Sequence, residues 1–262
     1  MEIIICKTEE EASRRAADLV SALVARKPKA VLGLATGSTP VKMYKCLIDD
    51  CKAGKISFKG VKSWNLDEYY GLPGTHDQSY RYFMDKNLFD SIDIVKRNTH
   101  VLNGLAKDWR KEVVSYERAI KAAGGIDLQV LGIGSDGHIA FNEPGSSLAS
   151  RTRLVSLTPQ TIKDNARFFK KAADVPRFAL SMGVGSILEA KQVVLLAFGA
   201  NKAAAVAAAV EGGVSQFCTA SALQMHQDAW FFLDAAAAAK LKLKKYYAWR
   251  AEEALNALLA GK

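Results

Sequence analysis

The chain has 262 residues, of which 49% are hydrophobic and 24% charged, and its 36 Lys and Arg against 27 Asp and Glu give a formal net charge of +9. These proportions exclude a collagen-like repeat, a disulfide-stapled miniprotein and a largely disordered chain, because enough apolar surface is present to offset the entropy of ordering. The positive charge favours an anionic partner, for which a small phosphorylated metabolite serves as well as a nucleic acid.

The four cysteines predict no disulfide framework, because they have no CxxC spacing and a chain of this length does not need disulfides as a scaffold. They are Cys6, Cys46, Cys51 and Cys218. We therefore expect reduced thiols and a cytoplasmic protein. The segment from Met1 to Lys7 lacks the basic start and long apolar stretch of a signal peptide. No apolar run reaches the roughly 18 residues that a membrane span needs.

Short apolar runs alternate with longer helix-like stretches along the chain, an order typical of parallel strands joined by crossover helices. The predicted strands are Glu2 to Cys6, Ala30 to Leu34, Val61 to Leu66, Leu128 to Ile133, Phe178 to Met182, Gln192 to Phe198 and Ala229 to Leu233. The predicted helices are Thr8 to about Ala25, Pro40 to Lys52, Ser79 to Phe89, Lys107 to Ala123, Thr161 to Lys171, Asn201 to Val210 and Ala235 to Leu259. Because no linker divides the chain, we expect one Rossmann-like α/β domain over residues 1–262, with a mostly parallel sheet of about seven strands and helices on both faces.

The last predicted helix contains an alanine tract, Ala235 to Ala239, followed by the basic cluster Lys240 to Lys245. Alanine is the best helix former, so we interpret the tract as part of a helix. The cluster is either a surface for a polyanion or a solvated helix face with its apolar residues turned inward. We favour the solvated face.

In open parallel sheets, ligands bind beyond the carboxyl ends of the strands, so the residues that follow each strand are the first candidates for a site. The second strand is followed by Gly37, Ser38 and Thr39, with Pro40 as the predicted first residue of a helix. Gly37 permits a sharp turn, so that amides and hydroxyls converge on an anion at the helix end. The pattern fits a phosphate site, and it fits a purely structural turn about equally well.

The third strand is followed by Asp67 and Glu68. Two adjacent carboxylates at the end of an apolar strand are costly to bury unless they are used or paired. Asp67 is therefore a candidate general base. The alternative is that both residues simply cap the turn, and from the sequence the two interpretations are even.

The fourth strand is followed by Asp136, His138 and Glu143, which lie among glycines within eight residues. An Asp can fix the orientation of a neighbouring His, which then works as an acid or base near neutral pH. We therefore interpret His138 as catalytic and Asp136 and Glu143 as its partners. These residues lack the spacing of zinc or calcium sites, so we expect no metal.

Two cations are candidates for contacts with an anionic ligand. Lys202 lies near the N-terminus of a predicted helix, where a positive charge is unfavourable unless an anion is bound there. Arg167, within a predicted helix, is the second candidate, and the alternative is that it is simply a solvated residue on the helix surface.

Several motifs in matching order, from about residue 31 to His226, resemble those of the glucosamine-6-phosphate deaminase family. They are Gly37-Ser38-Thr39-Pro40, Asn65-Leu66-Asp67-Glu68-Tyr69, Ser79-Tyr80 with Phe83-Met84, Asp136-Gly137-His138-Ile139-Ala140-Phe141-Asn142-Glu143-Pro144 and Ser147-Leu148-Ala149-Ser150-Arg151-Thr152-Arg153. The resemblance implies a fold shared with 6-phosphogluconolactonases. It also implies conversion of glucosamine 6-phosphate and water to fructose 6-phosphate and ammonia, without a cofactor.

The resemblance also implies roles for individual residues. Asp67 matches the base that moves a proton between C2 and C1, and His138, with Asp136 and Glu143, matches the group that opens the sugar ring. The phosphate-binding positions match Gly37, Ser38, Thr39, Arg167 and Lys202.

Regulation and assembly are less closely defined by the resemblance. Ser146 and Arg153 match the allosteric site of members that N-acetylglucosamine 6-phosphate activates, whereas Val155 replaces a lysine of those members, which weakens the case for activation. The family contains hexamers and monomers, and both stay open here.

Two alternative functions differ in what they would require of the sequence. A 6-phosphogluconolactonase needs no base at C2, and the Phe-Asn-Glu continuation of the loop after His138 is the deaminase form. A sugar-phosphate-sensing domain of a transcription regulator needs a DNA-reading module, and little room precedes the first predicted strand and helix. We therefore expect a small amino sugar phosphate as the partner, and neither nucleic acid nor membrane.

Overall fold

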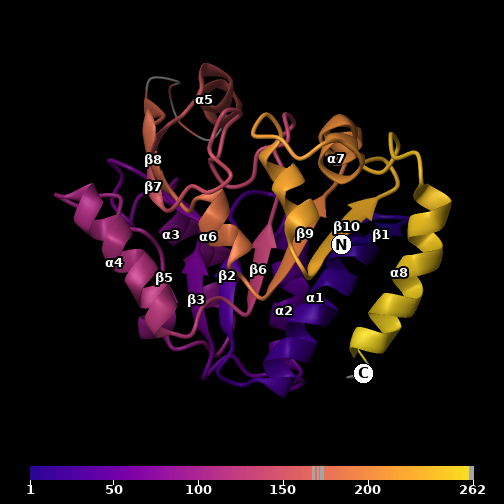
Figure 1. Cartoon of the computed structure of the whole chain (residues 1–262). Coiled ribbons are helices and arrows are strands. Elements are labelled where there is room, and N and C mark those ends of the chain that lie inside the picture. The colour runs from indigo at the N-terminus through magenta and orange to yellow at the C-terminus, as the bar shows by residue number, and fades with distance from the viewer. Residues whose placement is uncertain (167–168, 170, 172–173, 260–262) are drawn as a thin grey trace.

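The computed structural model describes residues 1–166, 169, 171 and 174–259, and its centre is a seven-stranded sheet in which neighbouring strands are parallel (Figure 1). The strand order is β1-β10-β9-β6-β2-β3-β5. The strands are β1 (Glu2–Cys6), β10 (Ala229–Asp234), β9 (Gln192–Ala197), β6 (Leu128–Leu131), β2 (Val31–Leu34), β3 (Lys62–Asn65) and β5 (Thr99–His100). This confirms the predicted mostly parallel α/β architecture.

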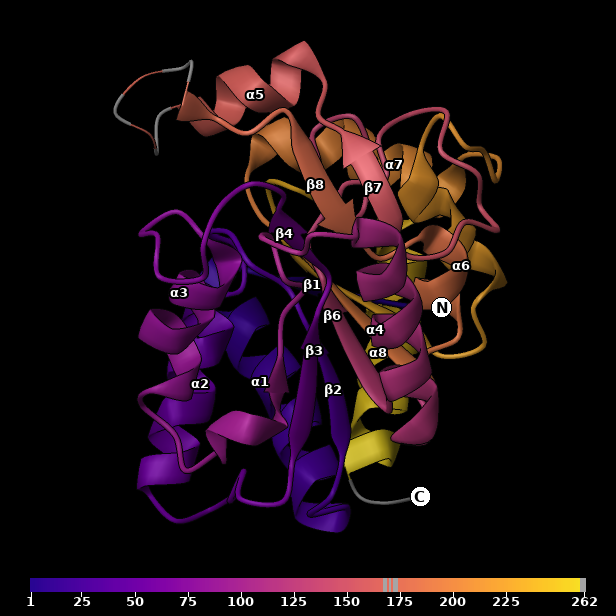
Figure 2. The ribbon, with the colours of Figure 1, turned by 90° about the vertical axis from the view of Figure 1, so that its left-hand side faces the viewer.

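Helices cover both faces of this sheet, as Figure 2 shows for α1 and α2 on one side and α4 and α6 on the other. The α-helices are α1 (Glu9–Arg26), α2 (Val41–Lys52), α3 (Tyr80–Met84), α4 (Trp109–Ala122), α5 (Pro159–Asn165), α6 (Val184–Leu188), α7 (Ala203–Glu211) and α8 (Lys244–Leu259). The Thr8 side chain caps α1 by accepting the Glu11 amide, as its sequence predicts. No helix among the described residues has the length and apolar character that crossing a membrane requires.

A second, three-stranded antiparallel sheet corrects one part of the prediction. The predicted strand from Phe178 to Met182 is β8 (Phe178–Ser181), and it pairs with β4 (Asp67–Tyr69) and β7 (Arg153–Ser156) instead of joining the main sheet. The seventh place in the main sheet is taken by β5, which has two residues. A strand that short carries no hydrophobic pattern by which its sequence could be recognised.

The alanine tract before α8 is not helical, so that part of the prediction was wrong. Residues 235–240 form turns, and α8 begins only at Lys244. The Asp234 carboxylate accepts the Ala237 amide at 2.7 Å, and Ala237 and Ala238 are fully buried. Tertiary burial and a side-chain hydrogen bond therefore override helix propensity here.

The basic cluster Lys240 to Lys245 accordingly lies mostly ahead of α8 and not on a helix face. Its lysines are exposed, but only Leu241 of its two apolar residues is buried, since Leu243 is 54% exposed. The interpretation as a helix face with both apolar residues turned inward was wrong.

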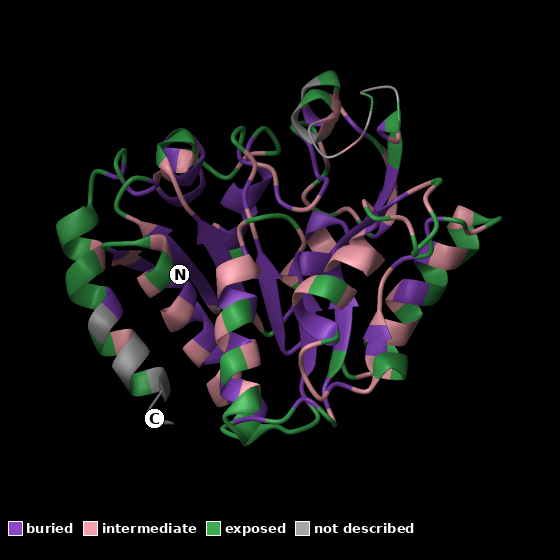
Figure 3. Cartoon of the chain, turned by 180° about the vertical axis from the view of Figure 1, so that it is seen from behind, coloured by how far each residue is buried: buried purple, intermediate pink, exposed green. Residues whose placement is uncertain are grey.

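The strands form the buried centre of the molecule, which Figure 3 shows in purple between partly exposed helices. At the amino end of β6, the buried carboxylate of Asp127 accepts hydrogen bonds from Lys27 and Lys191 at 2.7 Å each and from the Val31 amide at 2.8 Å. These contacts tie three parts of the sheet together at the end opposite to the loop that follows the carboxyl end of β6.

Candidate active site

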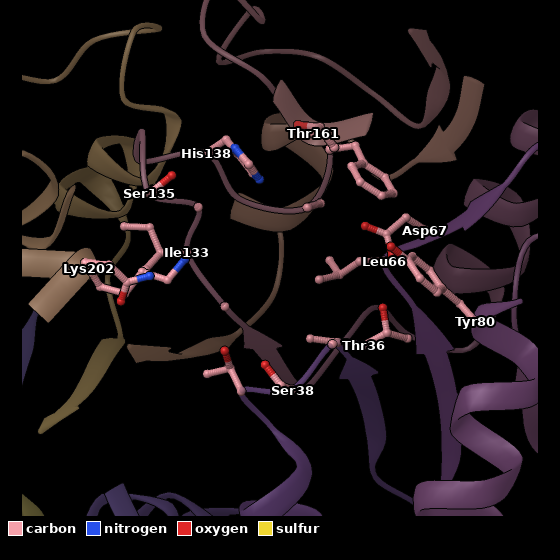
Figure 4. A pocket seen from close by; sticks show the side chains of 18 of the residues that line it. Thr36, Ser38, Leu66, Asp67, Tyr80, Ile133, Ser135, His138, Thr161 and Lys202 are labelled. Carbon is pink, nitrogen blue, oxygen red and sulfur yellow. The ribbon is translucent and has the colours of Figure 1, made fainter. Parts of the chain in front are cut away.

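A cavity of about 780 Å³ lies beyond the carboxyl ends of β2, β3, β6 and β9 (Figure 4). This is the edge of a parallel sheet at which ligands are expected. Its lining residues are Ala35, Thr36, Gly37, Ser38, Thr39, Leu66, Asp67, Tyr80, Gly132, Ile133, Gly134, Ser135, His138, Ala140, Phe141, Thr161, Lys163, Asn201 and Lys202. The cavity therefore brings together the predicted phosphate turn, Asp67, His138 and Lys202.

The turn after β2 lies at the N-terminal end of α2. Gly37 has φ +89°, a left-handed conformation that glycine adopts readily. The residue that caps α2 is Pro40 and the helix starts at Val41, one position later than predicted, with no side chain forming the cap. The hydroxyl groups of Ser38 and Thr39 are therefore not used to cap the helix, and both residues line the cavity.

Asp67 and Glu68 have different environments, which separates the two interpretations left open by the sequence. Asp67 is 6% exposed, lines the cavity and forms no side-chain hydrogen bond with the described residues. Glu68 follows it in β4, where successive side chains point to opposite faces. Its carboxylate accepts the amides of Tyr80 and Arg81 at the start of α3. Only Glu68 acts as a cap.

The Asp67 carboxyl is strongly perturbed by this position. Burial, and secondly the negative charge of Glu68, raise the pKa of Asp67 to about 8. Desolvation disfavours the charged form of any carboxyl group, and a like charge adds to the effect. A perturbed carboxyl in a cavity is a candidate for general base catalysis.

His138 lies between two carboxylates in the loop after β6. Its Nδ1 atom is 2.7 Å from Asp136 Oδ1 and 3.6 Å from Glu143 Oε2. The contact with Asp136 is an ion pair when the imidazole carries its second proton. The His138 ring lowers the pKa of Asp136 to about 2. Asp136 and Glu143 are not among the described residues lining the cavity, but both orient the histidine that does line it.

Gly134 and helix α5 hold His138 and its two carboxylate partners in place. A Cβ atom on Gly134 would lie 2.4 Å from the His138 ring and 2.7 Å from Asp136 Oδ1, so only glycine leaves room for both side chains. Glu143 accepts hydrogen bonds from the hydroxyls of Thr158, at 3.2 Å, and Thr161. Since Thr158 is also the N-cap of α5, this helix holds Glu143 in place.

The same three side chains have the geometry of a cation site. One ligand atom each from Asp136, His138 and Glu143 lies within 4.8 Å of the others, and oxygen and imidazole donors suit several divalent metals. The mutual contacts of the three side chains fit an oriented acid–base histidine equally well. That no metal is needed stays a prediction.

Of the two cations predicted to bind the phosphate, Lys202 is the one that the structure describes. Lys202 lines the cavity at the start of α7. Arg167 lies outside the residues that the structure describes.

The two candidate allosteric residues are in contact with each other. Arg153 donates to Ser146 Oγ at 3.1 Å and to Asn142 Oδ1 at 2.8 Å, and neither Arg153 nor Ser146 lines the cavity. Burial lowers the pKa of Arg153.

Two lining residues of α5, Thr161 and Lys163, were missed by sequence reasoning. The helix was predicted, but nothing in its sequence says that it folds over the carboxyl end of the main sheet. The one available signal was the pair Thr158 and Thr161, whose spacing is that of a capping residue and its partner.

Comparison with known proteins identifies the family of the chain. The model of the family described as glucosamine-6-phosphate isomerases/6-phosphogluconolactonase matches residues 7–231. A glucosamine-6-phosphate deaminase of Shewanella loihica is 55% identical over 259 residues, which cover 99% of this chain and 96% of that protein. One of Clostridioides difficile is 50% identical over 246 residues, covering 94% and 99%.

Solved structures give the same result for the fold. The structure of a monomeric glucosamine-6-phosphate deaminase superposes with a TM-score of 0.90 at 42% identity, over 92% of this chain and 100% of that one. A 6-phosphogluconolactonase from Trypanosoma cruzi gives a TM-score of 0.75 at 21% identity, over 92% and 97%, a likeness that shows the fold alone. The chain belongs to the family of glucosamine-6-phosphate isomerases and 6-phosphogluconolactonases.

Proposed function

We propose that this chain is a glucosamine-6-phosphate deaminase, which converts glucosamine 6-phosphate and water to fructose 6-phosphate and ammonia. The observation that carries the proposal is one cavity holding a carboxyl of raised pKa, Asp67, an imidazole between two acids, His138, and a cation, Lys202. Relatives 50–55% identical to almost the whole chain are named as deaminases, which supports the same assignment.

Ring opening is the first step of the proposed reaction. The closed sugar must lose the proton of its C1 hydroxyl and gain one at the ring oxygen. His138 can accept the first proton and donate the second, since an imidazole works in both directions near neutral pH. Asp136 and Glu143 orient the ring through their contacts with Nδ1.

Isomerisation and deamination follow in the open chain. Asp67 removes the proton at C2, the double bond forms between C1 and C2, and Asp67 returns the proton to C1. General-base help of this kind is worth roughly 10²- to 10⁴-fold in rate. The product of this proton transfer carries a C2 imine, and addition of water releases ammonia and leaves the ketose.

The phosphate takes no part in these bond changes. We assign its binding to the turn of Gly37, Ser38 and Thr39, to Lys202 and to Arg167. The binding energy holds C1 and C2 of the sugar against Asp67 and His138, and so acts through orientation.

Several coarser features belong to the same proposal. We propose a single domain over residues 1–262 that works in the cytoplasm without metal or cofactor, takes a small amino sugar phosphate as its only substrate partner, and binds neither nucleic acid nor membranes. A homo-oligomer and a monomer are both compatible with the family. If an activator binds, we assign it to Ser146 and Arg153, with Val155 arguing against such binding.

Ammonia release tests the proposal directly. Purified protein should release ammonia from glucosamine 6-phosphate in step with the formation of fructose 6-phosphate. Hydrolysis of 6-phosphogluconolactone without ammonia release would instead assign the chain to the other activity of its family. Binding of the amino sugar phosphate without turnover would identify a sensing domain.

A further inference from the structure

Glu68 is a buried carboxylate that the proposed reaction does not use. Its side chain is 1% exposed and is not among the described residues that line the cavity. It accepts four hydrogen bonds: the amides of Tyr69 at 2.8 Å, Tyr80 at 2.9 Å and Arg81 at 3.0 Å, and the Ser79 hydroxyl at 2.9 Å. Each carboxylate oxygen therefore has two donors.

The neighbours of Glu68 favour its ionised form. Amide groups only donate, and the first amides of α3 have no partner within the helix, so an acceptor with a negative charge satisfies them. Burial is the largest influence and raises the pKa of Glu68 above its ordinary value, and the hydrogen bonds from Tyr80, Arg81, Ser79 and Tyr69 offset part of that rise. The guanidinium of Arg81 is directed to Asp85 and Thr99 instead, so no described cation forms an ion pair with Glu68.

The charge of Glu68 adds to burial, the larger cause, in raising the pKa of Asp67, its neighbour in β4. The other polar groups around Asp67 differ in kind from Glu68. The hydroxyls of Tyr69 in β4, Tyr80 in α3 and Tyr116 in α4 interact with its charge, and His138, Thr161, Lys163 and Lys202 share its cavity. Of these neighbours only Glu68 is a carboxylate.

Glu68 also fixes one wall of the site. Tyr80, whose amide it accepts, lines the cavity next to Asp67, and Figure 4 shows the two side chains directed toward each other. The Tyr80 ring stacks on Phe141, which also lines the cavity, with the centroids 6.0 Å apart and the planes 13° from parallel. The same hydrogen bonds that hold the Glu68 carboxylate therefore hold this aromatic wall.

We infer that Glu68 is a positioning residue for the reaction: its fixed negative charge keeps the Asp67 carboxyl a strong base, and its hydrogen bonds to the start of α3 hold Tyr80 against the sugar. The inference rests on the proposed function, because it assigns Asp67 the role of the base that acts at C2. It makes Glu68, beside burial, a second cause of the pH at which that base becomes active.

The test is the pH profile of kcat/KM for glucosamine 6-phosphate. In the native protein kcat/KM should rise with pH to a plateau, and the midpoint of the rise should lie near the pKa of Asp67, about 8. The Glu68→Gln variant removes the charge at the same side-chain size, although its amide nitrogen cannot accept the donors that faced one carboxylate oxygen. Its midpoint should fall by roughly one pH unit and stay above the ordinary value, since burial of Asp67, the larger cause of the raised pKa, is unchanged. Its rate on the alkaline plateau should also fall several-fold, because the base is weaker.

Ser79→Ala is the matched control. It removes one of the four donors and the cap of α3, yet leaves the Glu68 charge in place. This variant should have a lower melting temperature and an unchanged midpoint. Glu68→Asp, which keeps the charge, should retain a midpoint closer to the native one than Glu68→Gln does. A Glu68→Gln profile with the native midpoint and a uniformly lower rate would overturn the inference.

Carboxyl NMR of the native protein keeps the test independent of folding in the variant and of activity. With ¹³C-labelled Asp and Glu side chains, and with Asp67→Asn and Ser79→Ala to assign the signals, Glu68 should be ionised at neutral pH while Asp67 titrates near 8. A neutral Glu68 at neutral pH would overturn the inference even if ammonia is released. If both groups titrate as expected but the protein releases no ammonia, only the proposed function is rejected.

Discussion

The carboxyl group of Asp67 and the imidazole of His138 line the same cavity, although Asp67 begins β4 and His138 lies in the loop after β6. One hexose phosphate can therefore contact both groups, which the proposed sequence of ring opening and isomerisation requires. Placement in separate regions of the molecule would have ruled out a common substrate.

Replacing Asp67 by Asn should remove isomerisation while the phosphate end of the substrate still binds. We expect ammonia release to fall by roughly 10²-fold or more, since the general base is lost. Substrate affinity, measured by calorimetry, should change little because the amide fills the same volume. Turnover within a few-fold of the native rate would show that another group removes the C2 proton.

Replacing His138 by Gln should affect ring opening more than the later steps. An open-chain analogue that cannot cyclise bypasses this step, so it should lose much less rate than glucosamine 6-phosphate does. The measurement is the ratio of kcat/KM for the two compounds in the native protein and in the variant. Equal losses for both compounds would contradict the assignment of His138.

Removing a phosphate contact should raise KM. Each charged hydrogen bond contributes about 1.5–3 kcal/mol, so Lys202→Ala and Arg167→Ala should each weaken substrate binding by roughly tenfold or more. Lys45→Ala is the control, because this exposed lysine of α2 does not line the cavity. Unchanged KM values in both test variants would remove the phosphate assignment.

The stability of the protein should depend on pH through Asp67. Its pKa rises from an ordinary value of 3.8 to about 8 on folding, so the folded state binds the extra proton between these two pH values. The free-energy cost of burying the charge is absent below about pH 4, increases as pH rises, and is complete above about pH 8. The neutral Asp67→Asn variant avoids this cost.

We therefore expect Asp67→Asn to be more stable than the native protein at alkaline pH, by on the order of 2–5 kcal/mol. Urea unfolding at about pH 5, 7 and 9 should show a difference that increases across the series. A difference that is the same at all three pH values would mean that Asp67 is not the titrating group.

Gly134→Ala should impair the chemistry more than the fold. Its added Cβ meets the His138 ring at 2.4 Å, and the ring can swing away at the expense of its position between the two carboxylates. A displacement of this size can reduce kcat by about 10²-fold. Gly213→Ala, where a Cβ meets no atom within 4 Å, should leave kcat unchanged. A fully active Gly134→Ala variant would show that the His138 position is not critical.

Much of the fold was predictable because its strands are long, apolar and separated by helices with clear start signals. The strands β1, β9 and β10 and the cap at Thr8 follow directly from such patterns. The pairing of β8 with β4 and β7 could not be predicted in this way, because an apolar run does not indicate which strands it pairs with. The alanine tract failed because Asp234 and tertiary burial outweigh local propensity.

The candidate site shows the same division between local and long-range information. Asp67, His138 and Lys202 were predicted because each follows a buried strand, and the ends of parallel strands meet at one edge. The different environments of Asp67 and Glu68 were not predictable, since they depend on α3 supplying amides to one residue and not to its neighbour. The contribution of Lys163 depends on where α5 folds, which its sequence does not encode locally.

The contacts of Asp127 with Lys27 and Lys191 lie at the amino end of β6, whereas the loop that carries His138 follows its carboxyl end. The stabilising contacts and the residues of the candidate site therefore lie at opposite ends of the same strand. Substitutions at Asp127 should alter heat tolerance and leave turnover intact, so natural variation or an engineer can adjust the working temperature of this enzyme without retuning its chemistry.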